Sequence, residues 1–404
     1  MINENEKKDF VESLKEAISN IIQNTNPLYY HDYNFDNYLK NECYLHYESF
    51  MNEELYNEIY DKYIETIFLE LNMIKRSYLC SDERFDHKNN HKEQITYLKN
   101  VPQPAQKTNE WYEFRKNHLT GSNIWKAFSS ESCKNQLLHE KLVPPMEQKT
   151  SNSGLSEGPL NWGHKYEQLS ILFYEYYNDV KVEEFGCIPH KTVDFLAASP
   201  DGIVTSEKNN GRMVEIKNVV SREITKIPKM EYYCQMQLQM EVCDLPDCDF
   251  VETKFVEYEN EEEFKKDKYN IKKGMIIVLV KNNESYIYEY SPLFQNSENQ
   301  LNNFSETIYE KYDLNDTTLE KDNIKWFRNI YWKLEIYSCV YVPRNKKWFE
   351  EAYITLKQLW DLIISERSIE DSYLKYKPKT RKNSKDTKEL NELDTKNNNK
   401  IIHL

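Results

Sequence analysis

Two acidic residues and a lysine fall on what the sequence predicts to be a pair of neighbouring strands. Asp201 belongs to the first strand, and Glu215 and Lys217 stand two residues apart on the next. Successive side chains of a strand point to opposite faces, so Glu215 and Lys217 project together. The turn-like segment 206–211 lies midway between the two acids. A hairpin that folds there places the carboxylates side by side.

This arrangement suits the hydrolysis of a phosphodiester. That reaction needs an activated water and positive charge at the phosphate, and a hard divalent cation held by carboxylates supplies both. We expect Asp201, Glu215 and the backbone carbonyl of Ile216 to hold magnesium. Lys217 would position the water or steady the developing charge. Each piece alone also fits a turn or an exposed strand face, and it is their combination across a hairpin that predicts a metal-dependent hydrolase.

Further polar residues occur on the helices predicted around this hairpin. The upstream segment Trp162–Glu167 opens a helix and adds a third carboxylate, Glu167. The helix expected over 231–242 carries Gln235 and Gln239, which share one side because they are four residues apart. Both helices are therefore expected to bring polar groups towards the two acids.

In chain order, five motifs resemble those of the lambda-exonuclease and YqaJ-type viral recombinase nucleases of the PD-(D/E)XK superfamily. They are W-x3-R-x3-L-T-x-S, W-G-x2-Y-E, S-P-D-G, E-x-K and a helical Q-x-Q. The resemblance covers about Trp111 to Val242, with a weaker echo at Arg344–Phe349. One such motif alone is weak evidence for the family, whereas five in the right order are specific evidence for it.

The resemblance implies a role for each residue of the core. Glu167 matches a helix carboxylate that approaches the metal, in part through water. Asp201 and Glu215 match the metal-binding acids, and Lys217 matches the catalytic lysine. Gln235 matches a glutamine that orients groups around the lysine and the phosphate.

Arg115 and Ser122 match the pair that grips a terminal 5′-phosphate in this family. A guanidinium fork and a hydroxyl suit a dianionic end. The ordinary alternatives are an arginine in a surface ion pair and a serine that caps a helix beginning at Asn123.

The implied activity is that of an Mg²⁺-dependent 5′→3′ exonuclease on double-stranded DNA ends, with Mn²⁺ able to substitute. An endonuclease or single-strand nuclease on the same core remains an alternative, as does a non-catalytic DNA-binding module. The implied partners are double-stranded DNA ends, a single-strand annealing protein and further copies of the chain in a homo-oligomer.

Some features depart from the family pattern. Relatives can carry a further acid between the W-G-x2-Y-E and S-P-D-G motifs. Glu183, Glu184 and Asp194 are the local candidates, and none of them aligns securely. One metal and two metals therefore both stay open. A ring-shaped trimer is known in the family, but the segments that flank the matching region could cap or block such a ring.

The predicted secondary structure supports a fold that can position these residues. Helices are expected over 111–128, 162–177 and 231–242, and strands over 180–189, 195–199, 202–205, 213–219, 249–257, 274–280 and 285–290. This order predicts an α/β (α+β) fold, in which a central mixed β-sheet is flanked by helices. Beyond Asn296 the chain again looks helical, most clearly over Arg344–Ile364.

Composition divides the chain into three parts. We expect a helical accessory segment at 1–100, a nuclease domain at 101–370 and a disordered basic tail at 371–404. The polar stretch 81–92 reads as a linker, and two prolines follow it. The lysines of the tail could contact DNA or form a nuclear address, and the simpler interpretation is a solvated tail.

Overall charge and hydrophobicity exclude some classes of protein. A formal charge of −14 argues against a protein that coats nucleic acid without sequence specificity. A local basic channel for nucleic acid is still compatible with this charge. The apolar run 275–280 is far too short to span a bilayer, and the N-terminus lacks a signal-peptide pattern. The eight cysteines form no CxxC pair, which favours reduced thiols over a zinc site. We therefore expect a cytoplasmic protein without a membrane partner, of a type that suits a large DNA virus or phage-like element.

Overall fold

The structure is a computed structural model. It describes residues 4–25, 35–70, 91–104, 108–144, 158–225, 228–268, 270–282, 285–314 and 324–378. None of the helices in these ranges is long and apolar enough to cross a membrane.

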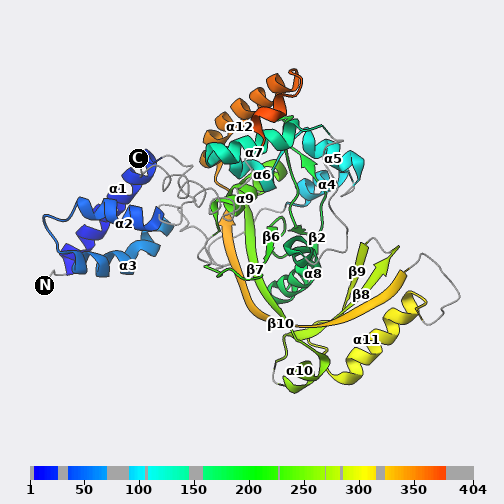
Figure 1. The fold of residues 1–404 in the computed structure, drawn as a ribbon. Coiled ribbons are helices and arrows are strands. Elements are labelled where there is room, and N and C mark those ends of the chain that lie inside the picture. Colours follow the sequence, from blue (N-terminus) through cyan, green and yellow to red (C-terminus); the bar gives the residue numbers. More distant parts are fainter. Residues whose placement is uncertain are drawn as a thin grey trace, which may run out of the picture.

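A seven-stranded mixed sheet forms the centre of the described chain (Figure 1). Strands β6 and β7 run parallel, and the other neighbouring pairs are antiparallel. This confirms the predicted mixed sheet and its α/β class. In spatial order the strands are β2 (Val182–Glu183), β5 (Gly202–Val204), β6 (Met213–Asn218), β7 (Asp247–Glu257), β10 (Ile324–Pro343), β8 (Lys273–Lys281) and β9 (Ser285–Tyr290).

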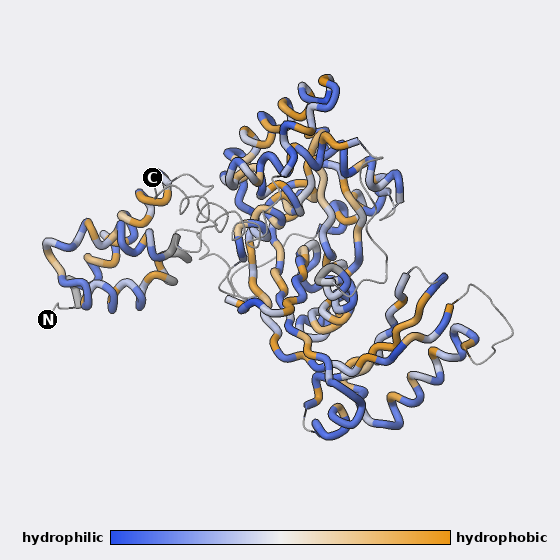
Figure 2. Tube along the Cα trace, viewed as in Figure 1, coloured by the Kyte–Doolittle hydropathy of each residue, from blue (hydrophilic) through white to orange (hydrophobic). Residues whose placement is uncertain are grey.

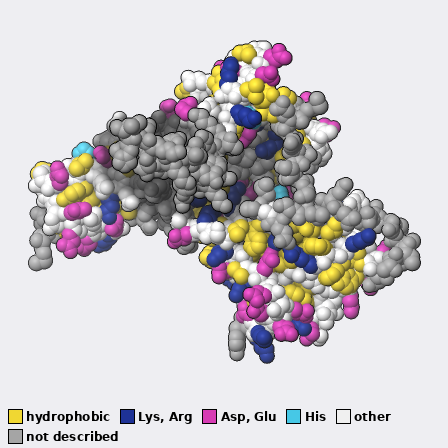
Figure 3. Space-filling model, in the orientation of Figure 1, with side chains coloured by type: hydrophobic (Ala, Val, Ile, Leu, Met, Phe, Trp, Pro, Cys, Tyr) yellow, Lys and Arg dark blue, Asp and Glu magenta, His cyan; other side chains and the backbone are white. Residues whose placement is uncertain are grey.

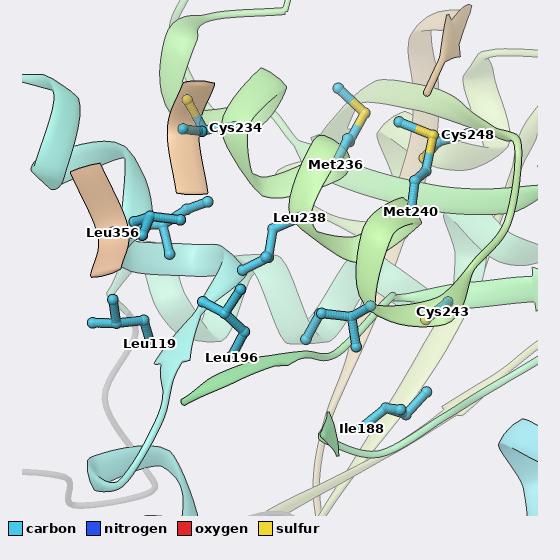
Figure 4. Packing of buried hydrophobic residues seen from close by; sticks show 14 of the residues in the cluster. Leu119, Ile188, Leu196, Cys234, Met236, Leu238, Met240, Cys243, Cys248 and Leu356 are labelled. Atoms are coloured by element: carbon cyan, nitrogen blue, oxygen red, sulfur yellow. The ribbon is translucent and has the colours of Figure 1, made fainter. Parts of the chain in front are cut away.

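A smaller sheet lies beside the central one. Its strands, in order, are β1 (Leu119–Thr120), β4 (Leu196–Ala198) and β3 (Ile188–Pro189). Helix α9 (Met230–Cys243) packs between the two sheets with 9 of its 14 residues buried. Figure 4 shows Met236, Leu238 and Met240 of this helix among hydrophobic residues from β1, β3 and β4. The predicted helix over 231–242 is thereby confirmed, and the structure shows that it is also a core element.

Helix α8 (Pro159–Asn178) covers the opposite face of the central sheet. Its Ile171 and Tyr174 pack against Val214, Ile216 and Val251 of β6 and β7. The strands that carry Asp201, Glu215 and Lys217 are thus held between α8 and α9. Hydrophobic residues concentrate on these inner strands in Figure 2.

Strand β10 shows that one expectation was wrong. The chain beyond Asn296 is helical at α11 (Glu298–Lys311) and α12 (Lys346–Arg367), but a strand of 20 residues lies between them. Residues 332–343 of β10 pair with β7, and residues 324–333 pair with β8. Its partners come from earlier parts of the chain, and its crowded apolar residues obscure the two-residue period that marks a strand.

The outer half of β10 forms an arm together with β8, β9, α10 (Glu261–Lys266) and α11. The helices cover one face of this arm, where Phe264, Leu301 and Ile308 pack on Met275 and Ile277. The other face carries Ile276 and Val278, which belong to a separate cluster with Tyr166 of α8.

The N-terminal segment is helical, as expected, but it falls into two parts. Helices α1 (Glu4–Asn24), α2 (Phe35–Leu45) and α3 (Glu53–Glu70) pack on one another around a core of their own. Helix α4 (Lys92–Asn100) instead buries Ile95 and Leu98 in the core around α9 and the smaller sheet. Most of the predicted linker at 81–92 lies outside the described residues.

The first residues of the predicted tail are ordered elements of the fold. A 3-10 helix at Ser372–Tyr376 lies against α7 (Glu131–Leu142), and Ser372 is buried. Lys375 pairs with Glu366 of α12 at 3.0 Å. Residues 379–404, with Lys379, Arg381, Lys382 and Lys385 of the tail, lie outside the described residues.

Candidate active site

The hairpin of β5 and β6 sets the two acids opposite each other. Gly202 pairs with Val214 in the antiparallel register. One step further along both strands, Asp201 therefore faces Glu215. The connecting turn contains Gly211 with a φ of +87°, a backbone conformation that glycine adopts without strain. The predicted hairpin and its register are confirmed.

Asp201 is fixed by the backbone of the neighbouring strand. Its Oδ2 accepts a hydrogen bond from the N–H of Ile216 at 2.7 Å. Burial and the negative charge of Glu215 raise the pKa of Asp201 well above its usual value, while Lys217 acts in the opposite direction. The carboxylates are thus close enough to repel each other, which is the condition that a divalent cation relieves.

Glu215 is fully buried, and each of its oxygens has a partner. Oε1 accepts a hydrogen bond from Lys217, and Oε2 accepts one from Nε2 of Gln239 at 2.8 Å. The same Nε2 donates to the carbonyl of Ser199 at 2.9 Å, two residues before Asp201. Gln239 therefore links Glu215 of β6 to the segment that leads into β5, at the end of the hairpin that carries the two acids.

Gln235 lies one turn earlier on α9, away from this contact. A Cβ atom at Gly121 would come within 3.3 Å of its Cγ, so Gln235 packs against the residue that precedes Ser122. Sequence reasoning assigned a role to Gln235 and noted only that Gln239 shares its side. The four-residue spacing was the available signal, but it does not say which glutamine reaches Glu215.

Lys217 is held as a cation. Burial alone would lower the pKa of Lys217, but the charges of Glu215 and Asp201 raise it above its usual value. Its ammonium also lies 5.1 Å from the ring centre of Tyr232. The lysine is therefore protonated throughout the neutral range, as a donor to developing negative charge requires.

Arg222 and Glu252 lie beside this lysine and were missed from the sequence. The guanidinium of Arg222 is 5.5 Å from the ring centre of the same Tyr232, and Arg222 donates to the buried Glu252. Glu252 pairs in register with Lys217 across β6 and β7. Neither residue belongs to a recognisable spacing, because β7 follows β6 only after the whole of α9.

Glu167 approaches the site from α8. A buried network of Ser170, Asn218 and Thr253 fixes this helix on β6 and β7, with hydrogen bonds of 2.7–2.8 Å. Glu167 is partly exposed, and its charge contributes to raising the pKa of Asp201. The helix carboxylate therefore acts on the same site as the two strand acids.

Arg115 and Ser122 are brought together as a pair. Nη2 of Arg115 donates to Oγ of Ser122 at 2.9 Å, and the guanidinium lies 4.7 Å from the ring centre of Trp111. Ser122 is exposed, and the helix there, α6 (Gly121–Ile124), has Thr120 as its N-cap. Neither ordinary alternative describes the pair, since Arg115 meets a hydroxyl and Ser122 does not cap the helix.

The residues present suit a hard cation. Among the described residues, no group of three His, Cys, Asp or Glu side chains is placed to hold a metal ion. A metal here would accordingly rest on Asp201, Glu215, a backbone carbonyl and water, which are the oxygen ligands that Mg²⁺ prefers. Glu183, a candidate for a second site, is engaged with Lys99 at 2.5 Å.

Comparison with known proteins agrees with the motifs. A family model described as the YqaJ-like viral recombinase domain matches residues 110–246. The chain is 30% identical over 317 residues to the uncharacterized protein R354 of Acanthamoeba polyphaga mimivirus. The aligned residues make up 69% of this chain and 56% of that protein. It thus spans little more than half the length of this relative.

Solved structures with some likeness to the chain include two bacterial exonucleases. The alkaline exonuclease LHK-Exo from Laribacter hongkongensis gives a TM-score of 0.37 at 18% identity, over 66% of this chain and 96% of that one. A phage-related exonuclease from Haemophilus somnus gives 0.33 at 14% identity, over 63% and 99% of the two chains.

The matched segment contains every residue that the motifs singled out, from Arg115 to Gln235. The hairpin acids, the lysine and the helix glutamines of that segment meet in space as described above. Residues 110–246 therefore match the YqaJ-like viral recombinase domain, and the described site lies within this match.

Proposed function

We propose that this protein is a metal-dependent DNA exonuclease that degrades double-stranded ends in the 5′→3′ direction. The observation that carries the proposal is the convergence of Asp201, Glu215 and Lys217 at one hairpin. The buried Glu215 meets the lysine on one oxygen and Gln239 on the other. The match of residues 110–246 to the YqaJ-like viral recombinase domain supports the same function.

Asp201, Glu215 and the carbonyl of Ile216 would hold Mg²⁺, for which Mn²⁺ can substitute, and Glu167 would reach the metal through water. When bound, the metal supplies an acidic water and neutralises charge on the phosphate. Lys217, kept protonated by its acidic neighbours, donates to the attacking water or to the developing charge.

End recognition is assigned to Arg115 and Ser122. A guanidinium has five N–H donors, and the bond to Ser122 uses one of them. The remaining donors and the exposed hydroxyl suit the dianion of a terminal 5′-phosphate. Gln235, packed beside Gly121, would orient groups around Lys217 and the phosphate.

The setting of the reaction follows from the same proposal. Resection of an end leaves a single strand, so the product suits recombination or repair in a viral-type genome, with a single-strand annealing protein as partner. A homo-oligomer and a cytoplasmic replication site belong to this proposal as well.

The test is digestion of end-labelled linear duplex in Mg²⁺, with and without a 5′-phosphate, beside a circular duplex. The proposal predicts progressive shortening from phosphorylated 5′ ends and an intact circle. Cutting of the circle would assign an endonuclease instead, and cutting of single strands alone would assign a single-strand nuclease. Binding without any cleavage would leave a DNA-binding module.

A further inference from the structure

The arm formed by β8, β9 and the outer half of β10 has one aromatic face. Side-chain alternation along β9 places Tyr286, Tyr288 and Tyr290 on the same side. Their register partners on β8 include Val278 and Val280, which lie opposite the helix-covered face of Met275 and Ile277. We call this surface the tyrosine face.

A bulge in β10 adds a fourth ring to the tyrosine face. The register of β10 shifts between Trp326 and Arg328, which leaves Phe327 as the extra residue. Phe327 lies 5.5 Å from Tyr286 between ring centres, and Tyr286 lies 6.0 Å from Tyr288. Trp326 pairs instead with Leu279, whose side chain packs on the helix-covered face. The bulge therefore turns two consecutive aromatic side chains to opposite sides.

Cations accompany the rings on this face. The guanidinium of Arg328 lies 5.6 Å from the ring centre of Phe327, and the exposed Lys325 pairs in register with Val280. The described strand residues of the tyrosine face are Ile276, Val278, Val280, Tyr286, Tyr288, Tyr290, Lys325, Phe327, Arg328 and Ile330. None of these residues carries a carboxylate. In Figure 3 hydrophobic side chains gather over the arm, with Lys and Arg among them.

The tyrosine face leads away from the candidate active site. The hydroxyl of Tyr290 donates to the carbonyl of Lys165 at 2.9 Å, two residues before Glu167. Burial, Tyr288 and the charge of Glu167 raise the pKa of Tyr290, in agreement with this proximity. A chain that leaves the carboxylates along β9 therefore meets Tyr290, Tyr288 and Tyr286 in turn.

We propose that the tyrosine face binds single-stranded DNA that leaves or enters the active site. Aromatic rings stack on the flat faces of any base, and neighbouring cations contact the phosphates. An intact duplex hides its base faces, whereas the strand left by resection exposes them. The inference rests on the proposed function, because resection is the source of this strand. It goes beyond that function by assigning the surface on which the strand lies.

The test compares two neighbouring aromatic residues in the full chain. Phe327 is 44% exposed on the tyrosine face, and Trp326 is 50% exposed on the other side, so substitution of each removes a similar exposed ring. Wild type, Tyr286→Ala, Phe327→Ala and Trp326→Ala are titrated into a fluorescent thymidylate oligonucleotide of about 20 residues, without divalent metal. Fluorescence anisotropy gives Kd, and thermal unfolding confirms that each variant folds.

We expect Kd to rise at least about fivefold for Tyr286→Ala and for Phe327→Ala, and to stay unchanged for Trp326→Ala. Equal effects of Phe327→Ala and Trp326→Ala, or no effect of either, would overturn the proposal. So would light scattering that shows Phe327→Ala splitting an oligomer, because the face would then bind a second copy of the chain.

Cleavage of blunt duplex in Mg²⁺ by the same preparations separates the two claims. Unchanged oligonucleotide binding by the variants, with active wild type, refutes the tyrosine face alone. A ring-dependent Kd with no cleavage by wild type refutes the exonuclease proposal alone.

Discussion

At the residue scale, Glu215 is the side chain on which the candidate site depends. A fully buried carboxylate is costly unless its oxygens are satisfied, and here a lysine and a glutamine satisfy them. Gln239 also holds the carbonyl of Ser199, so it fixes Glu215 relative to Asp201. We infer that Gln239 positions the metal-binding acid without touching the substrate.

Replacement of Gln239 by Leu should slow cleavage by about tenfold to a hundredfold, because Glu215 loses a buried donor and shifts relative to Asp201. Steady-state digestion of linear duplex at several Mg²⁺ concentrations measures kcat and the metal requirement. Gln237→Leu is the matched control: Gln237 is equally buried on α9 but bonds to Pro343 and Asn345. Similar cleavage by both variants would show that Gln239 has only a structural role.

Arg115→Ala should remove the preference for a 5′-phosphate by a factor of about ten or more, since a charge-assisted contact is lost. The measurement is the ratio of initial rates on duplexes with and without the phosphate. Ser122→Ala should lower the same ratio to a lesser extent. A ratio that stays at the wild-type value in Arg115→Ala would contradict the assignment of end recognition to this pair.

At the scale of elements, local pairings were predictable and distant ones were not. The β5–β6 hairpin joins residues near in sequence, so spacing and turn residues were enough to place Asp201 opposite Glu215. Strand β10 pairs with β7 and β8, which end 67 and 43 residues before it begins. Nothing in its own crowded apolar sequence identifies those partners, and the Arg222–Glu252 pair beside Lys217 was missed for the same reason.

Lys141 fixes helix α7 against the segment that carries Arg115. It is buried on α7, and its Nζ donates to the carbonyls of Arg115 and His118 at 2.6 Å each. A neutral amine has two N–H groups, which these two carbonyls satisfy. Burial and the charge of Arg115 lower the pKa of Lys141 to about 7, from its usual 10.5.

The lowered pKa of Lys141 predicts a pH dependence of stability. Between pH 7 and 10.5 the unfolded chain binds a proton that the folded chain has released, so the free energy of unfolding rises with pH in this window. Compared with Lys141→Met, wild type should gain about 1 kcal/mol per pH unit there. Urea unfolding of both proteins at pH 6, 7.5 and 9 measures the difference. A difference that is constant with pH would show that Lys141 stays charged.

At the scale of the whole molecule, the described chain contains separate hydrophobic cores. The buried residues of the α1–α3 core all come from those helices, whereas α4 belongs to the core around α9 and the smaller sheet. The sequence predicted the helical character of residues 1–100 from periodicity. It could not assign α4, because the partners of Ile95 and Leu98 come from distant elements.

Removal of residues 1–90 should therefore leave cleavage of linear duplex within about twofold of wild type, since no part of the main core is lost. Removal of residues 1–101 also removes α4. It should lower the unfolding temperature of the remaining chain by several degrees, because the buried side chains of Ile95 and Leu98 are lost. Loss of cleavage in the shorter deletion, with the domain still folded, would make the N-terminal helices part of the catalytic unit.

The most direct test of the account concerns the hairpin. Wild type, Asp201→Ala, Lys217→Ala and the turn variant Lys208→Ala are incubated with 5′-phosphorylated linear duplex and Mg²⁺, and released nucleotides are measured. We predict that wild type and Lys208→Ala release nucleotides at similar rates, while Asp201→Ala and Lys217→Ala fall by a factor of about a thousand or more. Equal release by all four proteins would contradict the assigned site.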